Sequence, residues 1–283
     1  MIKNSVSVVI TTKNEEKNIG RCLESIKNQT YPEQKIEIIV VDNNSTDKTV
    51  EIAKTYTDSV FNKGPERSAQ RNFGIKKAKG NYVMFLDADM SLSPKLIEDC
   101  VERISDGIFA GLYIPEIMTG NSFWGKVRNF ERSFYNGTVI DCVRFFPKKI
   151  WQELGGFDES LIAAEDWDLD RRLAAIGKTT VTASVLFHSE RNFSFKKYLK
   201  KKAYYAQDIL KYIKKWGRDD PIIRKQLGLK YRYFDVFTEN GKWKKWIRYP
   251  HFMFAVFVLK FLVGANYSLI RIAGRLKNEE HRL

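Results

Sequence analysis

The chain has 283 residues, 43% of them hydrophobic, which favours a globular protein with either one large domain or a domain with an appendage. The first apolar run, residues 6–10, is too short for the hydrophobic region of a secretory leader, so we expect a cytosolic N-terminus. The three cysteines lie far apart without zinc-ligand spacing, and we interpret them as reduced thiols.

The net charge of +14 is distributed unevenly along the chain. Residues 1–190 hold 25 Lys and Arg against 27 Asp and Glu, residues 191–250 hold 18 against 5, and residues 251–283 hold 5 against 2. A basic, aromatic-rich C-terminal segment suits nucleic acid, an anionic membrane surface or a phosphorylated substrate. A solvated, lysine-rich helix face would have the same composition, so charge alone leaves these interpretations open.

The N-terminal part repeats one pattern, in which a short apolar strand leads into an amphipathic helix. The expected strands are 5–10, 36–41 and 59–61, and the expected helices follow near 19–26, 50–56 and 66–79. Such alternation predicts an α/β fold with a mostly parallel central sheet and helices on both faces.

Residues 81–90, NYVMFLDADM, form an apolar strand that ends in two aspartates. If the extended conformation continued, Asp87 and Asp89 would point the same way and could share Mg²⁺ or Mn²⁺. An isolated D-x-D is more often an acidic turn, so the context decides. Polar clusters also follow the first two strands, at 11–15 and 42–47, and the ends of parallel strands form the ligand-binding edge of such sheets.

Neither the G-x-G-x-x-G dinucleotide fingerprint nor a P-loop is present. The order of SVVITTKNEEKNIGRCLESI, VVDNNSTDKT, GPERSAQRNFGIKKAKGNYVMFLDADM, GGFDE and AEDWDLDRRL resembles the inverting glycosyltransferases of family 2, which have the GT-A fold. The resemblance covers residues 5–188. It implies binding of a nucleotide-diphosphate sugar, with UDP or GDP as the nucleotide, and of Mn²⁺ or Mg²⁺.

The resemblance also assigns roles to residues. Asn43 stands where many relatives have a second aspartate, which leaves the base and ribose preference open. The implied nucleotide-binding residues are Thr11, Asn14, Glu15, Asp42, Arg71 and Asp87. Among them, Asp42 would contact the base and Arg71 would lie near the base or phosphate. Asp87 and Asp89 would bind the metal and the diphosphate.

The next segment predicts a helix after Ser93-Pro94 and a strand at 107–114. Residues 121–135 then alternate aromatic and basic side chains. This pattern is typical of an ordinary packed helix, although it would also suit a surface for an acceptor or a membrane.

The pair Glu165-Asp166 opens a predicted helix after the turn at 155–159. Acidic residues in a first turn are favourable by helix-dipole placement, and pairing with Arg171 or Arg172 accounts for Asp168. For Glu165-Asp166 the resemblance implies instead that Asp166 is the catalytic base and that Glu165 binds the acceptor. Inverting transfer needs one base within reach of the acceptor hydroxyl.

A strand at 179–187 is expected to end at His188. A single histidine there is usually a structural hydrogen-bonding residue, but relatives often have one that reaches the metal or diphosphate. The Q-x-x-R-W motif of processive synthases is missing from the helix expected at 198–216, which favours transfer of a single sugar.

Residues 249–270 form an apolar strip about long enough to span a bilayer, which takes ~20 residues. Lys260 falls near its middle, where a cation costs roughly 2.5–3.5 kcal/mol, and basic residues flank both ends. An interfacial helix or a re-entrant hairpin bending near Gly264 fits these facts better than a span, and a soluble helical cap is the alternative. We expect a GT-A domain at 1–192 and a basic helical, membrane-associated region at 193–283.

The sequence therefore predicts a glycosyltransferase on the cytoplasmic face of the cell membrane, with a lipid-linked acceptor and membrane lipids as partners and without nucleic acid. Two alternatives stay open. A nucleotidyltransferase would share the α/β architecture, but its Gly-rich N-terminal loop with a basic residue is absent from this sequence, where residues 11–16 are acidic. A non-enzymatic membrane-binding or nucleic-acid-binding module would use the basic tail.

Overall fold

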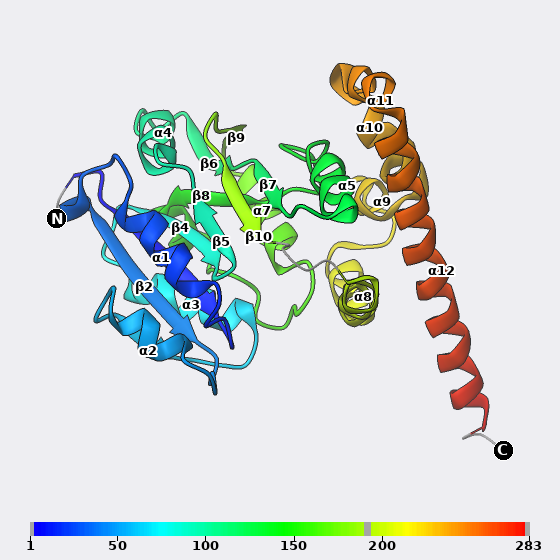
Figure 1. Ribbon diagram of the computed structural model, residues 1–283, viewed down its shortest axis with the longest axis horizontal. Coiled ribbons are helices and arrows are strands. Elements are labelled where there is room, and N and C mark those ends of the chain that lie inside the picture. The colour runs from blue at the N-terminus through cyan, green and yellow to red at the C-terminus, as the bar shows by residue number, and fades with distance from the viewer. Residues whose placement is uncertain (1–2, 190–193, 281–283) are drawn as a thin grey trace. The chain divides into compact units, whose positions relative to one another are not determined.

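A computed structural model describes residues 3–189 and 194–280 (Figure 1). The chain divides into two compact units, Met1–Thr119 with Tyr135–Ser189 and Gly120–Phe134 with Glu190–Leu283. The boundary expected at residue 192 therefore differs in one respect, since 120–134 belongs with the C-terminal residues. The reason is packing, because helix α5 (Phe123–Arg132) lies against helix α12 (Pro250–Glu280).

The first unit contains a seven-stranded sheet in the order β3-β2-β1-β4-β8-β6-β9. All neighbours are parallel except β8, which is antiparallel to both β4 and β6, so the sheet is mostly parallel as predicted. Its strands are β1 (Val6–Thr12), β2 (Ile36–Asp42), β3 (Val60–Asn62), β4 (Tyr82–Asp87), β6 (Phe109–Tyr113), β8 (Val143–Pro147) and β9 (Lys178–Val181).

Helices cover both faces of this sheet, because successive β1 side chains alternate between two cores. Val8 and Ile10 pack with the apolar faces of α1 and α4, whereas Val9 packs with residues of α3 and α7. The helices of this unit are α1 (Ile19–Lys27), α2 (Thr49–Lys54), α3 (Arg67–Lys77), α4 (Leu96–Ile104), α6 (Lys148–Glu153) and α7 (Glu165–Ala174), with a 3₁₀ turn at Glu33–Lys35. Helix α4 begins two residues after the predicted Ser93-Pro94 start.

A second, three-stranded sheet has the order β5-β10-β7. Its strands are β5 (Met90–Leu92), β10 (Leu186–Ser189) and β7 (Glu116–Thr119). The single strand predicted at 179–187 is wrong, since β9 and β10 belong to different sheets. The chain turns between them, where the Thr182 hydroxyl donates to the Ser184 carbonyl and Asp99 accepts from the amides of Ala183 and Ser184. This turn brings His188 opposite Met90 in β5.

The second unit is helical among the residues that the structure describes. Helix α12 continues through Gly264, so the bend required by the re-entrant hairpin is absent. Within 3–189 and 194–280, none of the helices combines the length and apolar character needed to cross a bilayer. Besides α5 and α12, the unit contains α8 (Phe195–Trp216), α9 (Pro221–Leu227), a π-helical turn (Tyr231–Asp235), α10 (Val236–Thr238), a 3₁₀ turn (Glu239–Gly241) and α11 (Trp243–Arg248).

Candidate active site

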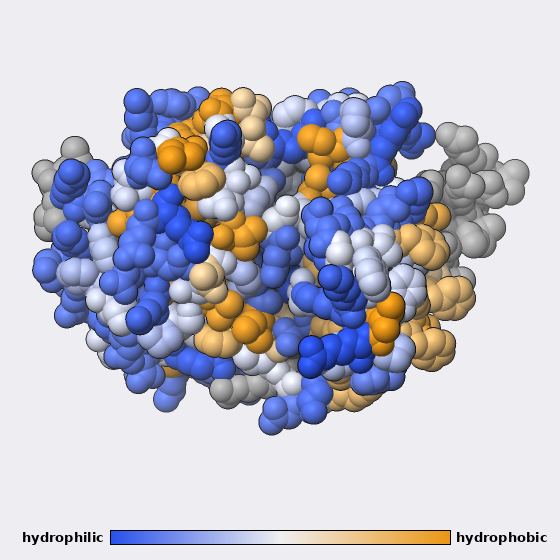
Figure 2. Space-filling model, turned by 90° about the horizontal axis from the view of Figure 1, so that it is seen from above, coloured by the Kyte–Doolittle hydropathy of each residue, from blue (hydrophilic) through white to orange (hydrophobic). Residues whose placement is uncertain are grey.

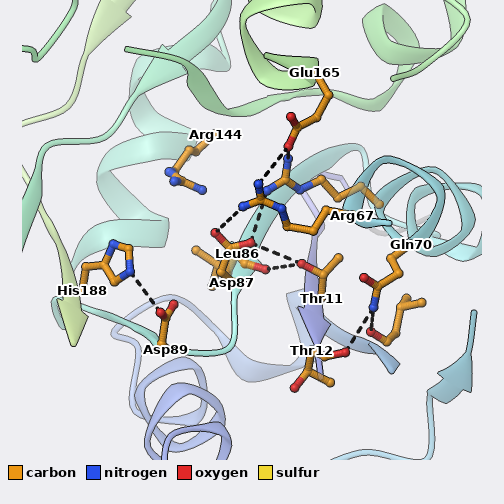
Figure 3. Close-up of polar contacts among 12 residues, drawn as sticks. Thr11, Thr12, Arg67, Gln70, Leu86, Asp87, Asp89, Arg144, Glu165 and His188 are labelled. Atoms are coloured by element: carbon orange, nitrogen blue, oxygen red, sulfur yellow. Dashed lines mark hydrogen bonds and ion pairs between the residues drawn. The ribbon is translucent and has the colours of Figure 1, made fainter. Parts of the chain in front are cut away.

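The two aspartates after β4 do not point the same way, contrary to the prediction. Strand β4 ends at Asp87, and Ala88 and Asp89 form a turn before β5, so the period of two is interrupted between the carboxylates. Asp87 Oδ1 accepts a hydrogen bond from the Thr11 hydroxyl at 3.3 Å, whereas Asp89 Oδ2 lies 3.0 Å from Nε2 of His188 (Figure 3). The two carboxylates therefore make their hydrogen bonds to different partners.

Arg71 links the end of β4 to the beginning of α7. Arg71 belongs to α3, and its side chain is buried. Its Nη2 lies 3.2 Å from Asp87 Oδ1, and its Nη1 lies 3.1 Å from Glu165 Oε1. The guanidinium also lies over the rings of Phe85 and Phe157, at 4.6 and 5.4 Å from their centroids. The prediction put Arg71 near a base or phosphate. In the structure both terminal nitrogens face carboxylates, one at the end of β4 and one at the start of α7.

Sequence reasoning missed Arg67, which lies one helical turn before Arg71. Its guanidinium approaches Asp87 Oδ2 at 3.9 Å and Glu165 Oε1 at 3.6 Å, and 34% of its side chain is exposed. Burial opposes ionisation of Asp87, but the cations of Arg71 and Arg67 outweigh it and hold the pKa of that carboxyl well below its usual range. The i, i+4 spacing was the available signal, because it places both arginines on one helix face.

Glu165 and Asp166 differ in their surroundings although they are neighbours. Ala164 precedes them with a φ of 63°, a left-handed conformation that is uncommon for alanine and sets the first turn of α7. Glu165 is buried, and burial followed by the charge of Asp166 raises its pKa even beside the two arginines. Asp166 is half-buried, and its Oδ1 accepts from the Trp167 amide at 2.9 Å. Of the pair, Asp166 is the more accessible carboxylate.

The loops after β1 and β2 are tied together by their predicted nucleotide-binding residues. Asn14 has a φ of 53°, and its backbone N–H donates to Ser45 Oγ at 2.7 Å. Its side-chain Oδ1 accepts from the backbone N–H of Thr46 at 2.8 Å. Buried Asp42 accepts from the Ser45 amide at 2.8 Å. The structure therefore brings Asn14 and Asp42 to one edge of the sheet.

Glu15 continues this contact, since its amide donates to Thr49 Oγ1 at 2.7 Å and its carboxylate accepts from Asn18 Nδ2 at 2.7 Å. Asn43, the departure from the family pattern, lies against Gly64 in the loop before α3. A Cβ at Gly64 would stand 2.2 Å from Asn43 Oδ1, so a larger residue there would require the Asn43 side chain to move.

A second cluster surrounds His188 and includes two residues that sequence reasoning missed. His188 Nδ1 lies 3.7 Å from Glu116 Oε2, and Arg144 Nε donates to Glu116 Oε1 at 2.8 Å. Burial opposes protonation of His188, but the carboxylates of Asp89 and Glu116 outweigh it and raise its pKa to about 10. A charged residue within the apolar run of β8 was the only sequence signal for Arg144.

Comparison with known proteins decides the family. The model of glycosyl transferase family 2 matches residues 7–153, which is more than half of the chain. The chain belongs to this family. The match favours a glycosyltransferase over the nucleotidyltransferase and the non-enzymatic module.

The family 2 chain is similar to glycosyltransferase AglE of Haloferax volcanii, with 30% identity over 188 residues that cover 61% of this chain and 62% of AglE. The aligned part therefore spans less than two thirds of that relative. A second relative comes from Methanococcus voltae, and this chain is 26% identical to it over 72% of both chains. That relative is a dolichyl N-acetyl-alpha-D-glucosaminyl phosphate 3-beta-D-2,3-diacetamido-2,3-dideoxy-beta-D-glucuronosyltransferase.

Two solved structures share the fold. The mannosyltransferase PcManGT of Pyrobaculum calidifontis, in complex with GDP-Man and Mn²⁺, gives a TM-score of 0.60 at 19% identity, over 96% of this chain and 79% of that one. Staphylococcus aureus TarS 1–349 with UDP-GlcNAc gives 0.55 at 19% identity, over 96% and 92%. These likenesses support the predicted fold class for this family 2 chain.

The predicted metal ligands of the glycosyltransferase, Asp87, Asp89 and His188, do not form a ready cluster. Among the described residues, no group of three or more His, Cys, Asp and Glu side chains is arranged to hold a metal ion, and Asp87 is turned toward Arg71. Asp89 nevertheless fits a divalent cation, because its Oδ1 is buried without a hydrogen-bond partner and carboxylate oxygens are the ligands that Mg²⁺ and Mn²⁺ prefer.

Proposed function

We propose that this family 2 glycosyltransferase transfers one sugar from a UDP- or GDP-sugar to an acceptor hydroxyl with inversion. The observation that carries the proposal is the Asp87–Arg71–Glu165 link. It ties the strand end expected to meet the donor diphosphate to the helix start that presents Asp166. Donor and base would thereby be held at one edge of the sheet, where ligands of such folds bind.

The reaction assigns a separate task to each part of this edge. The cross-linked loops of Asn14, Glu15 and Asp42 would receive the nucleotide, with Thr11 beside the diphosphate. Asp166 would accept the proton of the acceptor hydroxyl. The hydroxyl oxygen of the acceptor would at the same time bond to the anomeric carbon of the sugar, and the bond between that carbon and the diphosphate oxygen would break. Glu165, ion-paired and buried, is less suited to that proton transfer and would position the acceptor side.

A divalent cation, Mn²⁺ or Mg²⁺, would be held chiefly by Asp89, with Asp87 and His188 beside it. When bound, such an ion neutralises negative charge on a leaving diphosphate. Arg67, which is partly exposed beside Asp87, would add positive charge on the same side.

We also propose that the acceptor is lipid-linked, of the polyprenyl-phosphate type, and that the enzyme works at the cytoplasmic face of the membrane. The dolichyl phosphate in the name of the Methanococcus voltae relative supports the first part. The excess of 16 positive charges in residues 191–283, which hold 23 Lys and Arg against 7 Asp and Glu, supports the second.

Thermal unfolding of the full chain with a panel of UDP- and GDP-sugars, each with Mn²⁺ or with EDTA, tests the donor and metal assignments. A ligand that binds only the folded state raises Tm, so one nucleotide class should do so, and only with the cation. Asp89→Asn should abolish the cation-dependent rise, whereas Asp106→Asn, at an exposed turn, should keep it. An equal rise in EDTA would remove the metal from the mechanism, and no rise with any nucleotide sugar would overturn the proposal.

A further inference from the structure

Within residues 250–266 of helix α12, the charged side chain of Lys260 is turned inward, whereas two large aromatic side chains are exposed. Lys260 is its one charged residue between positions 250 and 270, and only 11% of its side chain is exposed. The Lys260 ammonium lies 3.3 Å from buried Glu131 of α5 and 5.3 Å from the ring centroid of Phe237. On the outer side, Phe254 and Phe261 are 72% and 70% exposed. A helix facing water would be expected to show the reverse arrangement.

The neighbouring helix α11 adds amphipathic residues to the same unit. Trp243 and Ile247 are exposed one turn apart, with exposed Lys244 and Arg248 beside them. Figure 2 shows apolar side chains gathered at the right-hand edge of the molecule, where Figure 1 draws α12. We call the exposed apolar residues of α11 and α12 the outer face: Trp243, Ile247, Phe254, Phe261 and Leu262.

We propose that the outer face docks on an anionic lipid bilayer, with α12 lying in the interface instead of spanning it. This deepens the proposed membrane location and names the surface responsible. Aromatic and aliphatic side chains beside exposed Lys and Arg are the composition of interfacial helices. The inward ion pair of Lys260 removes the charge that would otherwise oppose insertion of this strip.

Charge favours a lipid surface over a second copy of the chain. Residues 191–283 carry an excess of 16 positive charges, so two such regions brought together face to face would repel each other. The same excess attracts anionic headgroups, and that attraction weakens in salt. Insertion of the phenylalanines is insensitive to salt screening. The two contributions are therefore separable by experiment.

Cosedimentation of the full chain with phosphatidylglycerol-containing vesicles, in low and high salt, tests the surface. Phe254→Ser combined with Phe261→Ser should lower vesicle affinity at least about tenfold at both salt concentrations, because burial of one phenylalanine is worth about tenfold or more. Lys244→Glu with Arg248→Glu should lower it in low salt only. Ile108→Ser, at a similarly exposed apolar residue of the first unit, is the matched control and should bind like the parent chain.

Three results would overturn the docking proposal. They are no vesicle binding by the parent chain, unchanged binding of the double phenylalanine variant, and a dimer in light scattering that this variant converts to a monomer. The last would make the outer face an interface between copies. The nucleotide-dependent rise in Tm is measured on the same variants, and its persistence would show that failure of docking leaves the proposed donor site intact.

Discussion

Arg71 and Lys260 are two buried cations with similar contacts in different units. Each pairs with a buried carboxylate and each lies over aromatic rings. Arg71, however, joins two carboxylates at the carboxyl edge of a parallel sheet, next to partly exposed Arg67. Lys260 is enclosed by helices. A buried ion pair is therefore weak evidence for function, and its position at a ligand-binding edge is what distinguishes Arg71.

The largest effect should come from the accessible carboxylate on the Arg71 side of this comparison. Asp166→Asn keeps the shape of the side chain but removes its ability to take a proton, so kcat should fall by about 10²–10⁴ while donor affinity is retained. Calorimetry of nucleotide binding and transfer rates on the same preparation separate the two. If transfer survives and Glu165→Gln is the inactive variant, the roles of the pair are reversed.

Replacing each buried cation with methionine tests the comparison directly. Arg71→Met leaves Asp87 and Glu165 with the more distant Arg67 as their remaining ion-pair partner among the described residues, and Lys260→Met leaves Glu131 with Arg128, 2.6 Å away. Each variant should lower the free energy of unfolding by about 3 kcal/mol, because it removes one partner of a buried pair. Urea unfolding measures this loss.

Only Arg71→Met should also weaken nucleotide binding by the folded protein, because it alone touches the sheet edge. Lys260→Met serves as the matched control in the same binding assay. Equal loss of nucleotide binding in both variants would mean that position at the sheet edge does not distinguish the two cations.

Much of the fold could be predicted, because it depends on periodicity that one segment carries by itself. The alternation around Val8 and Val9 and the polar clusters after β1, β2 and β4 required no knowledge of distant partners. The turn at Ala88 could not be predicted from period two. It depends on β5 leaving the main sheet to pair with β10, a contact between residues about 100 positions apart.

The same reason explains which site residues were missed. Glu116 meets both Arg144 and His188 only because β7, β8 and β10 come together from separate parts of the chain. The direction of Lys260 likewise depends on Glu131, more than 100 residues earlier. Residues whose role rests on such pairings leave no local pattern, whereas Glu165-Asp166 stood out by their position at a helix start.

Asp170 sharpens the comparison because it is a buried carboxylate held without a cation among the described residues. It accepts hydrogen bonds from the Tyr113 hydroxyl at 3.1 Å and the Val143 amide at 3.2 Å. Burial raises the pKa of Asp170 to about 7, the opposite direction from Asp87 beside its arginines. Between about pH 4 and pH 7 the folded state therefore retains a proton that the unfolded chain has released.

Stability from this proton is fully present below the unfolded pKa and is lost as pH rises through about 7. The slope is at most about 1.4 kcal/mol for each pH unit, so this is the smallest of the effects when measured over one unit. Asp170→Asn, whose amide stays neutral, should remove that part of the slope in urea unfolding across the window, while Asp106→Asn at an exposed turn should follow the parent chain. An unchanged slope in Asp170→Asn would mean that the folded protein keeps this carboxylate ionised, and burial without a cation would then fail to separate Asp170 from Asp87.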